Sequence, residues 1–325
     1  MNRFSNPIAP FDAPDPFVTY DPVTGYYYAL FTRQDKLEIF RSRRAATLLT
    51  DNDSKVIFTL EDGHGYTDSI WAPEMHRAPD GRWYVYSSGR EIIDGKDEYH
   101  LFVMGALSDD PFGEWEFKGK PFTAEWGIDP TMYTAPDGKQ YMCFSYITND
   151  ETGHHNTLQI REMENPWTFG ERYAVIARPE LPWEKMPPFD KRRTINEGPF
   201  FVEAGGKLFI LYSANACWMV EYCLGVLEFT GGDLCDSANW VKHPEPVFTT
   251  GNGVYGPGHA SFFRSPDGSE LWIAYHAMDG WNENNNWKPR YMHLQKVHLD
   301  ENGTFTPAHP VADGEMMDPP AGEAE

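Results

Sequence analysis

The chain has 325 residues and a formal net charge of −22. This acidity argues against nucleic acid or an anionic membrane as the partner, because both are bound through basic surfaces. The longest apolar runs are only strand-sized, so no segment is predicted to span a membrane. A composition with 28 glycines, 26 prolines and 15% aromatic residues instead indicates a protein built of strands and turns.

Taken in chain order, five similar units follow one another. Each has a proline next to or near an acidic residue or a histidine, then a short run, a glycine turn and a β-rich strand. The prolines recur about every 60 residues, at Pro16, Pro73, Pro130, Pro199 and Pro257. An all-strand repeat of this length is typical of the blades of a β-propeller, whose innermost strands line a central channel.

The later strands of these units are predicted at 25–31, 37–43, 56–60, 100–106, 115–118, 157–163, 222–229, 240–241, 258–263, 271–277 and 290–299. The sequence therefore predicts an all-β fold, with a five-bladed β-propeller as a single catalytic domain over residues 1–306. Residues 307–325 are polar and acidic, and we expect this tail to be loose.

Two longer loops interrupt the repeat. Residues 178–193 are polar, rich in proline and contain Trp183, and residues 278–289 contain Trp281, three consecutive asparagines and Trp287. Long aromatic loops suit the rim of a binding site. We expect them to enclose a pocket instead of leaving an open groove.

Acidic residues stand at the head of three inner strands: Asp15, Asp129 and Glu197. In a propeller these side chains would converge at one end of the axis. Hydrolysis of a glycosidic bond needs two carboxyl groups, one as proton donor and one as base or nucleophile. A third carboxylate nearby would raise the pKa of the proton donor by like-charge repulsion. The alternative is that these acids cap loops or hold a cation in the channel.

With these motifs the sequence resembles glycoside hydrolase family 43, whose members are five-bladed propellers that act on arabinose- and xylose-containing glycans. The segments that carry the resemblance are Asp15-Pro16-Phe17-Val18, Trp71-Ala72-Pro73-Glu74, Ile128-Asp129-Pro130-Thr131, Asn196-Glu197-Gly198-Pro199-Phe200 and Gly256-Pro257-Gly258-His259. The resemblance implies that Asp15 is the general base, Glu197 the general acid, and Asp129 the residue that orients the acid and tunes its pKa. It also implies inversion, with Asp15 activating water.

The resemblance further implies that His259 borders a channel cation, commonly calcium, held largely through water. The alternative is a histidine with a structural role, because a single histidine does not select a metal. No organic cofactor is expected. Among candidate substrate-binding residues, Trp71 would stack on a sugar or belong to the core, and Arg290 would bind substrate near the acid or form a surface ion pair. Trp218 and His276 are candidates because they lie near strand ends.

The function that this resemblance favours is an exo-acting α-L-arabinofuranosidase that releases arabinose from arabinan or arabinoxylan oligosaccharides. A β-xylosidase on the same scaffold and a propeller that only binds glycans are the alternatives. Hydrolysis of aryl arabinofuranosides would exclude a propeller that only binds glycans. The first residues lack the apolar core of a signal peptide, which predicts a cytoplasmic protein unless a leader was removed. Cys143 is expected in the core. One disulfide between two of the later cysteines is possible, but the sequence does not imply it.

Overall fold

The secondary structure is almost entirely β. The computed structural model describes residues 3–122, 126–151, 153–185, 193–280 and 288–323. Within these ranges the helical elements are single 3₁₀ turns: η1 (Ala45–Thr47), η2 (Leu60–Asp62), η3 (Pro182–Glu184) and η4 (Ser237–Asn239). The all-β prediction is confirmed. No helix in the described part of the chain has the length and apolarity to cross a membrane.

The first two sheets are antiparallel, and in each the strands follow chain order. One holds β1 (Phe17–Asp21), β2 (Tyr26–Leu30), β3 (Lys36–Ser42) and β4 (Asp53–Thr59), and the other holds β5 (Asp68–Arg77), β6 (Trp83–Ile93), β7 (Lys96–Ala106) and β8 (Trp115–Gly119). Their later strands overlap the stretches predicted at 25–31 and 37–43 and include those predicted at 100–106 and 115–118.

The next sheet has eight strands, made of two antiparallel sets that are joined where β11 pairs with β13 in parallel. The sets are β9 (Ile128–Thr134), β10 (Gln140–Asp150), β11 (Gly153–Asn165) and β12 (Thr168–Ala177), then β13 (Arg193–Ala204), β14 (Lys207–Ala214), β15 (Cys223–Phe229) and β16 (Trp240–Lys242). The last sheet has three strands: β17 (Tyr255–Arg264), β18 (Leu271–Met278) and β19 (Arg290–Lys296). The sequence analysis did not predict β12.

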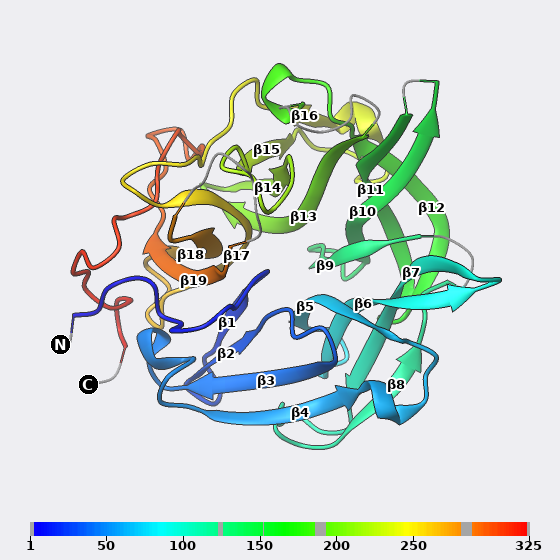
Figure 1. Ribbon diagram of the computed structural model, residues 1–325, viewed down its shortest axis with the longest axis horizontal. Helices are drawn as coiled ribbons and strands as arrows, with labels where there is room; N and C mark the ends of the chain where they lie inside the picture. Colours follow the sequence, from blue (N-terminus) through cyan, green and yellow to red (C-terminus); the bar gives the residue numbers. More distant parts are fainter. Residues whose placement is uncertain (1–2, 123–125, 152, 186–192, 281–287, 324–325) are drawn as a thin grey trace.

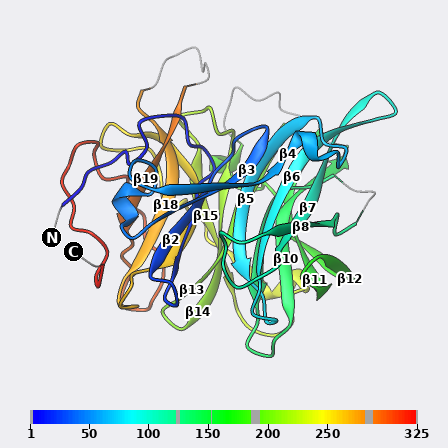
Figure 2. The same cartoon turned by 90° about the horizontal axis from the view of Figure 1, so that it is seen from below.

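The sets of strands surround a common centre. Figure 1 shows β1, β5, β9, β13 and β17 nearest to that centre, with the later strands of each set farther out. Figure 2 gives the view at right angles, with the sheets standing side by side. The first and last sheets contact each other directly, because the Val18 N–H on β1 donates to the Ser261 hydroxyl on β17 at 2.9 Å.

Each innermost strand has the same local backbone feature, just before the strand at Asp15 and within it in the other four. One residue, called the head of the strand below, has a positive φ, with values of 55° at Asp15, 45° at Ala72, 57° at Asp129, 52° at Gly198 and 44° at His259. For a residue with a side chain this left-handed conformation costs roughly 1–2 kcal/mol, so it persists only where the surrounding structure holds it. The feature brings the heads of different strands to equivalent positions.

The register of the last unit differs from the one read in the sequence. The second residue after each head pairs with the neighbouring strand, in the pairs Phe17–Leu30, Glu74–Tyr86, Thr131–Cys143, Phe200–Leu211 and Ser261–Ala274. Ala260, and not Pro257, therefore occupies the position that proline takes in the other four units. The proline spacing misled the register, because Pro257 lies two residues before the head at His259, whereas Pro16, Pro73, Pro130 and Pro199 directly follow their heads.

An aromatic layer lies one step along the strands from these heads. The Phe17 ring lies 6.2 Å from that of Phe200 and 5.3 Å from that of His76, and the Phe200 ring lies 5.9 Å from that of Phe262. These side chains come from four different innermost strands, and the three phenylalanines belong to a large apolar cluster. The layer packs the interior next to the strand heads and gives them a rigid support.

The tail is packed against the sheets, in contrast to the expectation of a loose segment. Phe4 and Met317 form a β-bridge, and the backbone N–H of Ala321 donates to Oε2 of Glu270 at 3.0 Å. Oε2 of Glu323 accepts the backbone N–H of Ala45 at 2.9 Å. The sequence missed these contacts because they join residues that lie from 51 to more than 270 positions apart.

All four cysteines are free, so the disulfide that the sequence left open does not form. Cys143 is completely buried in a cluster of apolar side chains, as predicted.

Candidate active site

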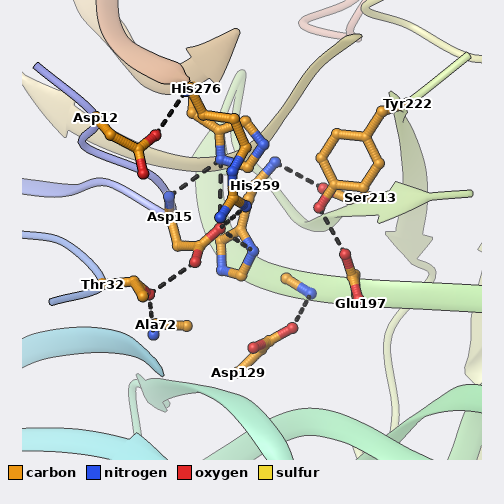
Figure 3. Close-up of polar contacts among 12 residues, drawn as sticks. Asp12, Asp15, Thr32, Ala72, Asp129, Glu197, Ser213, Tyr222, His259 and His276 are labelled. Atoms are coloured by element: carbon orange, nitrogen blue, oxygen red, sulfur yellow. Dashed lines mark hydrogen bonds and ion pairs between the residues drawn. The ribbon is translucent and has the colours of Figure 1, made fainter. Parts of the chain in front are cut away.

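Asp15 lies at the head of β1 with its carboxylate held by neighbours from other strands (Figure 3). Its Oδ2 accepts the Thr32 hydroxyl at 2.7 Å, and its Oδ1 lies 3.3 Å from Nη1 of Arg290. The Thr32 hydroxyl oxygen also accepts the backbone N–H of Ala72 at 2.8 Å. One hydroxyl therefore fixes Asp15 and ties β1 to the head of β5.

Two histidines from the last sheet complete the surroundings of Asp15. Nδ1 of His276 accepts the Asp15 backbone N–H at 3.0 Å, which places the ring proton on Nε2. Nδ1 of His259 lies 3.3 Å from the Asp15 Oδ1. Burial lowers the pKa of His276 to about 4 and also lowers the pKa of His259, so both rings are uncharged at neutral pH. Arg290 therefore supplies positive charge to Asp15.

The result is an Asp15 carboxyl group whose pKa lies far below its ordinary value. Burial acts to raise this pKa, but the polar surroundings of the carboxyl group, with the cation of Arg290 among them, lower it by more. Asp15 is thus ionised at neutral pH, in a state that can accept a proton.

Asp129, at the head of β9, is buried in a more negative environment. Its Oδ2 accepts the backbone N–H of Gly198 at 3.1 Å. Burial raises the pKa of Asp129 well above its ordinary value, and the nearby charges of Glu197 and Asp15 raise it further, against the opposing effect of the Gly198 N–H. Asp129 therefore keeps a proton at a pH where Asp15 has lost its own.

Gly198 allows this arrangement. Its φ is 52°, and a Cβ at this position would lie 3.0 Å from atoms of the His259 ring. A side chain would therefore be strained and would push β13 away from β17. The absence of a side chain lets the His259 ring pack on the backbone that donates to Asp129.

Glu197 is partly exposed and directly precedes Gly198. Its Oε1 accepts the hydroxyl of Tyr222 at 2.9 Å, as Figure 3 shows. The structure thus brings the three predicted carboxyl groups together, from β1, β9 and β13, and gives Asp15 and Asp129 opposite protonation.

The predicted substrate-binding residues differ in their surroundings. Arg290 was expected near the acid, and it forms an ion pair with Asp15, the predicted base. His276 has no exposed side-chain surface, because it is stacked on Tyr222 and bonded to Asp15. This burial argues against direct contact between His276 and a substrate.

The two tryptophans are partly exposed. Nε1 of Trp71 donates to Oε1 of Gln34 at 2.9 Å, and its ring stacks on Tyr99 at 4.9 Å. Trp218 packs beside Met219 in a small apolar cluster. The preceding residue, Cys217, lies close enough to Arg290, Glu197, Asp15 and Asp129 to interact with their charges, so this segment borders the site.

The described start of the 178–193 loop is firmly attached to the fold. Glu184 is completely buried, and its carboxylate forms an ion pair with Lys242 at 2.8 Å and accepts hydrogen bonds from the Asn196 side chain and the Tyr212 hydroxyl. Residues 186–192 and 281–287, with Trp281 and Trp287, lie outside the described residues. The predicted closure of the pocket by these loops stays a prediction.

The side chains around His259 bear on how a calcium ion could be held there. In the ranges that the structure describes, no three His, Cys, Asp or Glu side chains come together as ligands for a metal ion. Calcium prefers six to eight oxygen ligands, and the His259 ring faces Asp15. These residues do not fit a site in which the protein alone binds the ion.

Several residues of the site were missed in the sequence: Thr32, Ser213, Cys217 and Tyr222. Thr32 follows β2, and because β2 runs antiparallel to β1, its end had to lie near Asp15. The position of Thr32 was therefore a usable signal. The Ser213 hydroxyl accepts the His259 backbone N–H at 2.7 Å. Tyr222 and Ser213 come from another set of strands, and no local pattern indicates their contacts.

Comparison with known proteins identifies the family of the chain. The model of the family described as Glycosyl hydrolases family 43 matches residues 4–305. The chain belongs to glycosyl hydrolases family 43. The resemblance read from the strand heads is therefore confirmed.

This family 43 chain is also similar to individual curated proteins. It is 34% identical to the extracellular exo-α-(1→5)-L-arabinofuranosidase of Streptomyces avermitilis, over 96% of this chain and 64% of the relative. It thus spans less than two thirds of that relative. It is 35% identical to the protein of the same name from Streptomyces chartreusis, over 78% of this chain and 75% of the relative.

Among solved structures, the family 43 chain is similar to an α-L-arabinofuranosidase from Lactobacillus brevis. The TM-score is 0.84 at 27% identity, and the match covers 96% of this chain and 98% of the other.

One expectation is contradicted by these findings. Both Streptomyces relatives are named extracellular, which points to secretion and not to the cytoplasm. The cytoplasmic prediction is wrong because it drew on the first few residues alone, and these are too little to fix a location.

Proposed function

We propose that this family 43 protein is an exo-acting α-L-arabinofuranosidase that releases terminal arabinose from α-1,5-linked arabinan oligosaccharides with inversion. The observation that carries the proposal is one site that holds an ionised Asp15 and, opposite it, a proton on the Asp129–Glu197 pair, because inverting hydrolysis needs a base and an acid at the same pH. The exo action and the linkage follow the names of the Streptomyces relatives.

Asp15 acts as the general base. Its carboxylate is ionised at neutral pH and oriented by Thr32, so it can take a proton from a water that attacks the anomeric carbon. Arg290 stabilises this charged state and contacts the substrate beside it. We expect the carboxyl groups of Asp15 and Glu197 to be about 6.5–9.5 Å apart, which leaves room for the water.

Glu197 acts as the general acid, and Asp129 orients and tunes it. The two carboxyl groups share one proton at neutral pH, because two negative charges so close together in a buried site repel each other. Glu197 is the more exposed of the two and delivers this proton to the leaving oxygen. Trp71 and Trp218 border the sugar, and His276 orients Asp15 without touching the substrate.

The scaffold that supports this site is proposed to be a β-propeller with five blades. The five strand sets around one centre in Figure 1, each with a positive-φ head on its innermost strand, support this count. A crystal structure with another number of blades would contradict it.

The channel ion stays a prediction. His259 would border a calcium ion that is held largely through water, and no step of the proposed reaction passes through it. Extensive dialysis against a chelator should lower the melting temperature if the ion is present. An unchanged melting temperature and activity would leave His259 with a structural role beside Asp15.

The proposal is tested with a pair of aryl glycosides and one NMR measurement. The protein should hydrolyse aryl α-L-arabinofuranoside with a kcat/KM at least about tenfold above that for aryl β-D-xylopyranoside, since a site built for one sugar favours it by this order or more. The reverse ranking would identify a β-xylosidase, and no hydrolysis of either would identify a glycan-binding protein. Proton NMR of the first product should show the inverted anomer, and retention would make Asp15 a nucleophile.

A further inference from the structure

Tyr222 is a fully buried residue whose hydroxyl group is hydrogen-bonded to the carboxyl group of Glu197. Its hydroxyl donates to Oε1 of Glu197 at 2.9 Å, and its exposed fraction is 0%. Burial raises the pKa of the Tyr222 phenol well above its ordinary value, so this group stays protonated. It is therefore a hydrogen-bond donor at any pH at which the protein works.

The ring of Tyr222 is fixed in place from two sides. It packs on Gly258, where a Cβ would lie only 2.3 Å from a ring carbon. It also stacks on the ring of His276, with the two planes 2° apart and the centroids 5.4 Å apart. His276 in turn accepts the backbone N–H of Asp15. A single aromatic side chain, that of Tyr222, thus connects Glu197, the acid half of the site, to Asp15, the base half.

This geometry determines which oxygen of Glu197 carries the proton. Because Oε1 accepts the Tyr222 hydroxyl, protonation at Oε1 would compete with that bond, and the acidic proton belongs on Oε2. A proton held on one oxygen of a fixed carboxyl group has a defined direction. Such preorganisation of the proton donor is what general acid catalysis requires.

We propose that Tyr222 is a positioning residue that orients Glu197 for proton donation, and that Gly258 and His276 hold it in the required place. The inference rests on the proposed function, because it needs Glu197 to be the general acid. Figure 3 shows the Tyr222 hydroxyl directed at Glu197.

The direct test is Tyr222→Phe, which removes the hydroxyl and keeps the ring on His276. The kcat for arabinan oligosaccharides, which have a poor leaving group, should fall about 10–100-fold, within the range of general acid catalysis. Aryl arabinofuranosides with a good leaving group should lose less than about threefold, because they need little protonation. KM should change little, since Tyr222 is buried away from the substrate.

The pH profile gives a readout that a purely structural role would not move. A hydrogen bond to a carboxylate stabilises the charged form, so its loss should move the alkaline limb of kcat/KM upward by roughly one pH unit. Tyr84→Phe is the matched control, because Tyr84 is also buried and its hydroxyl donates to a carboxylate, Oδ2 of Asp80, at 2.7 Å. Tyr84→Phe should leave both limbs in place.

Gly258→Ala provides a second, independent variant. The added methyl group would displace the Tyr222 ring while the hydroxyl is still present, so the same dependence on leaving group should appear. Equal losses for good and poor leaving groups with an unmoved alkaline limb would overturn the inference. If wild type itself hydrolysed no arabinofuranoside, the proposed function would fail instead, and the two failures are therefore distinct.

Discussion

Asp15 on β1 and Asp129 on β9 share the same local structure. Each heads an innermost strand, each is followed by a proline, and their φ values are 55° and 57°. Both side chains are largely removed from solvent. Yet the pKa of Asp15 lies below its ordinary value and the pKa of Asp129 lies above it.

The difference comes from the strands that each residue faces. Asp15 faces the last sheet, which supplies the guanidinium of Arg290. Asp129 faces β13, which supplies the carboxylate of Glu197 and a backbone N–H from Gly198. The repeated local motif therefore fixes where a carboxyl group sits, whereas the neighbouring strands decide whether it is charged.

The largest expected effect is on the base half of the site. Asp15→Asn removes the group that activates water, so kcat should fall by about 10³–10⁴-fold for every substrate, whatever its leaving group. Asp21→Asn is a suitable control, because Asp21 caps the turn at Val23 and Thr24. Steady-state kinetics on aryl and oligosaccharide substrates would check this. A loss confined to poor leaving groups would make Asp15 the acid.

The proposed general acid, Glu197, should respond differently when its carboxyl group is replaced by an amide. Glu197→Gln removes the proton donor, so kcat should fall by about 10²–10³-fold for arabinan oligosaccharides and by much less for aryl glycosides with good leaving groups. A plot of log kcat against leaving-group pKa should therefore become steeper than in wild type. Parallel plots for the two proteins would remove Glu197 from the role of acid.

A smaller effect is expected from Asp129→Asn, with a loss of about 10–100-fold. This variant removes the carboxyl group that shares a proton with Glu197, so Glu197 no longer loses its proton against a neighbouring negative charge, and the alkaline limb of kcat/KM should move to lower pH. Asp137→Asn, in the turn before β10, serves as the control. An alkaline limb that stays in place would show that Asp129 does not tune the acid.

The smallest effect is expected at Arg290, the cation beside Asp15. Arg290→Gln should raise the pKa of Asp15, because a cation beside a carboxylate stabilises its ionised form. The acidic limb should then move up by roughly one pH unit, since the base works only when ionised. Arg290→Lys keeps the charge and should restore most of the shift. If the acidic limb of the pH–rate profile stayed at its wild-type position in both variants, Arg290 would act on the substrate alone.

The parts of the molecule that could be predicted are those set by short segments. Asp15, Asp129 and Glu197 were found because a proline or glycine next to an acid marks a strand head. The register of the last unit was wrong because it was aligned on Pro257, whereas the residue that follows the head His259 is Ala260. Tyr222 was missed because its partner belongs to another strand set, and no pattern in one sequence encodes such a contact.

The packed tail has a consequence for how the protein folds. The bond between Glu323 and Ala45 joins residues that are 278 positions apart, and the Arg3 side chain donates to the Met316 carbonyl across 313 positions. Contacts of such high sequence separation form late, because the loop that they close is long. During synthesis the first sheet must therefore wait, with this edge uncovered, until the segment that carries Glu323 has left the ribosome. A chain that stops before residue 315 would keep the strands that carry the carboxyl groups and lose the segment that joins the first sheet to the last.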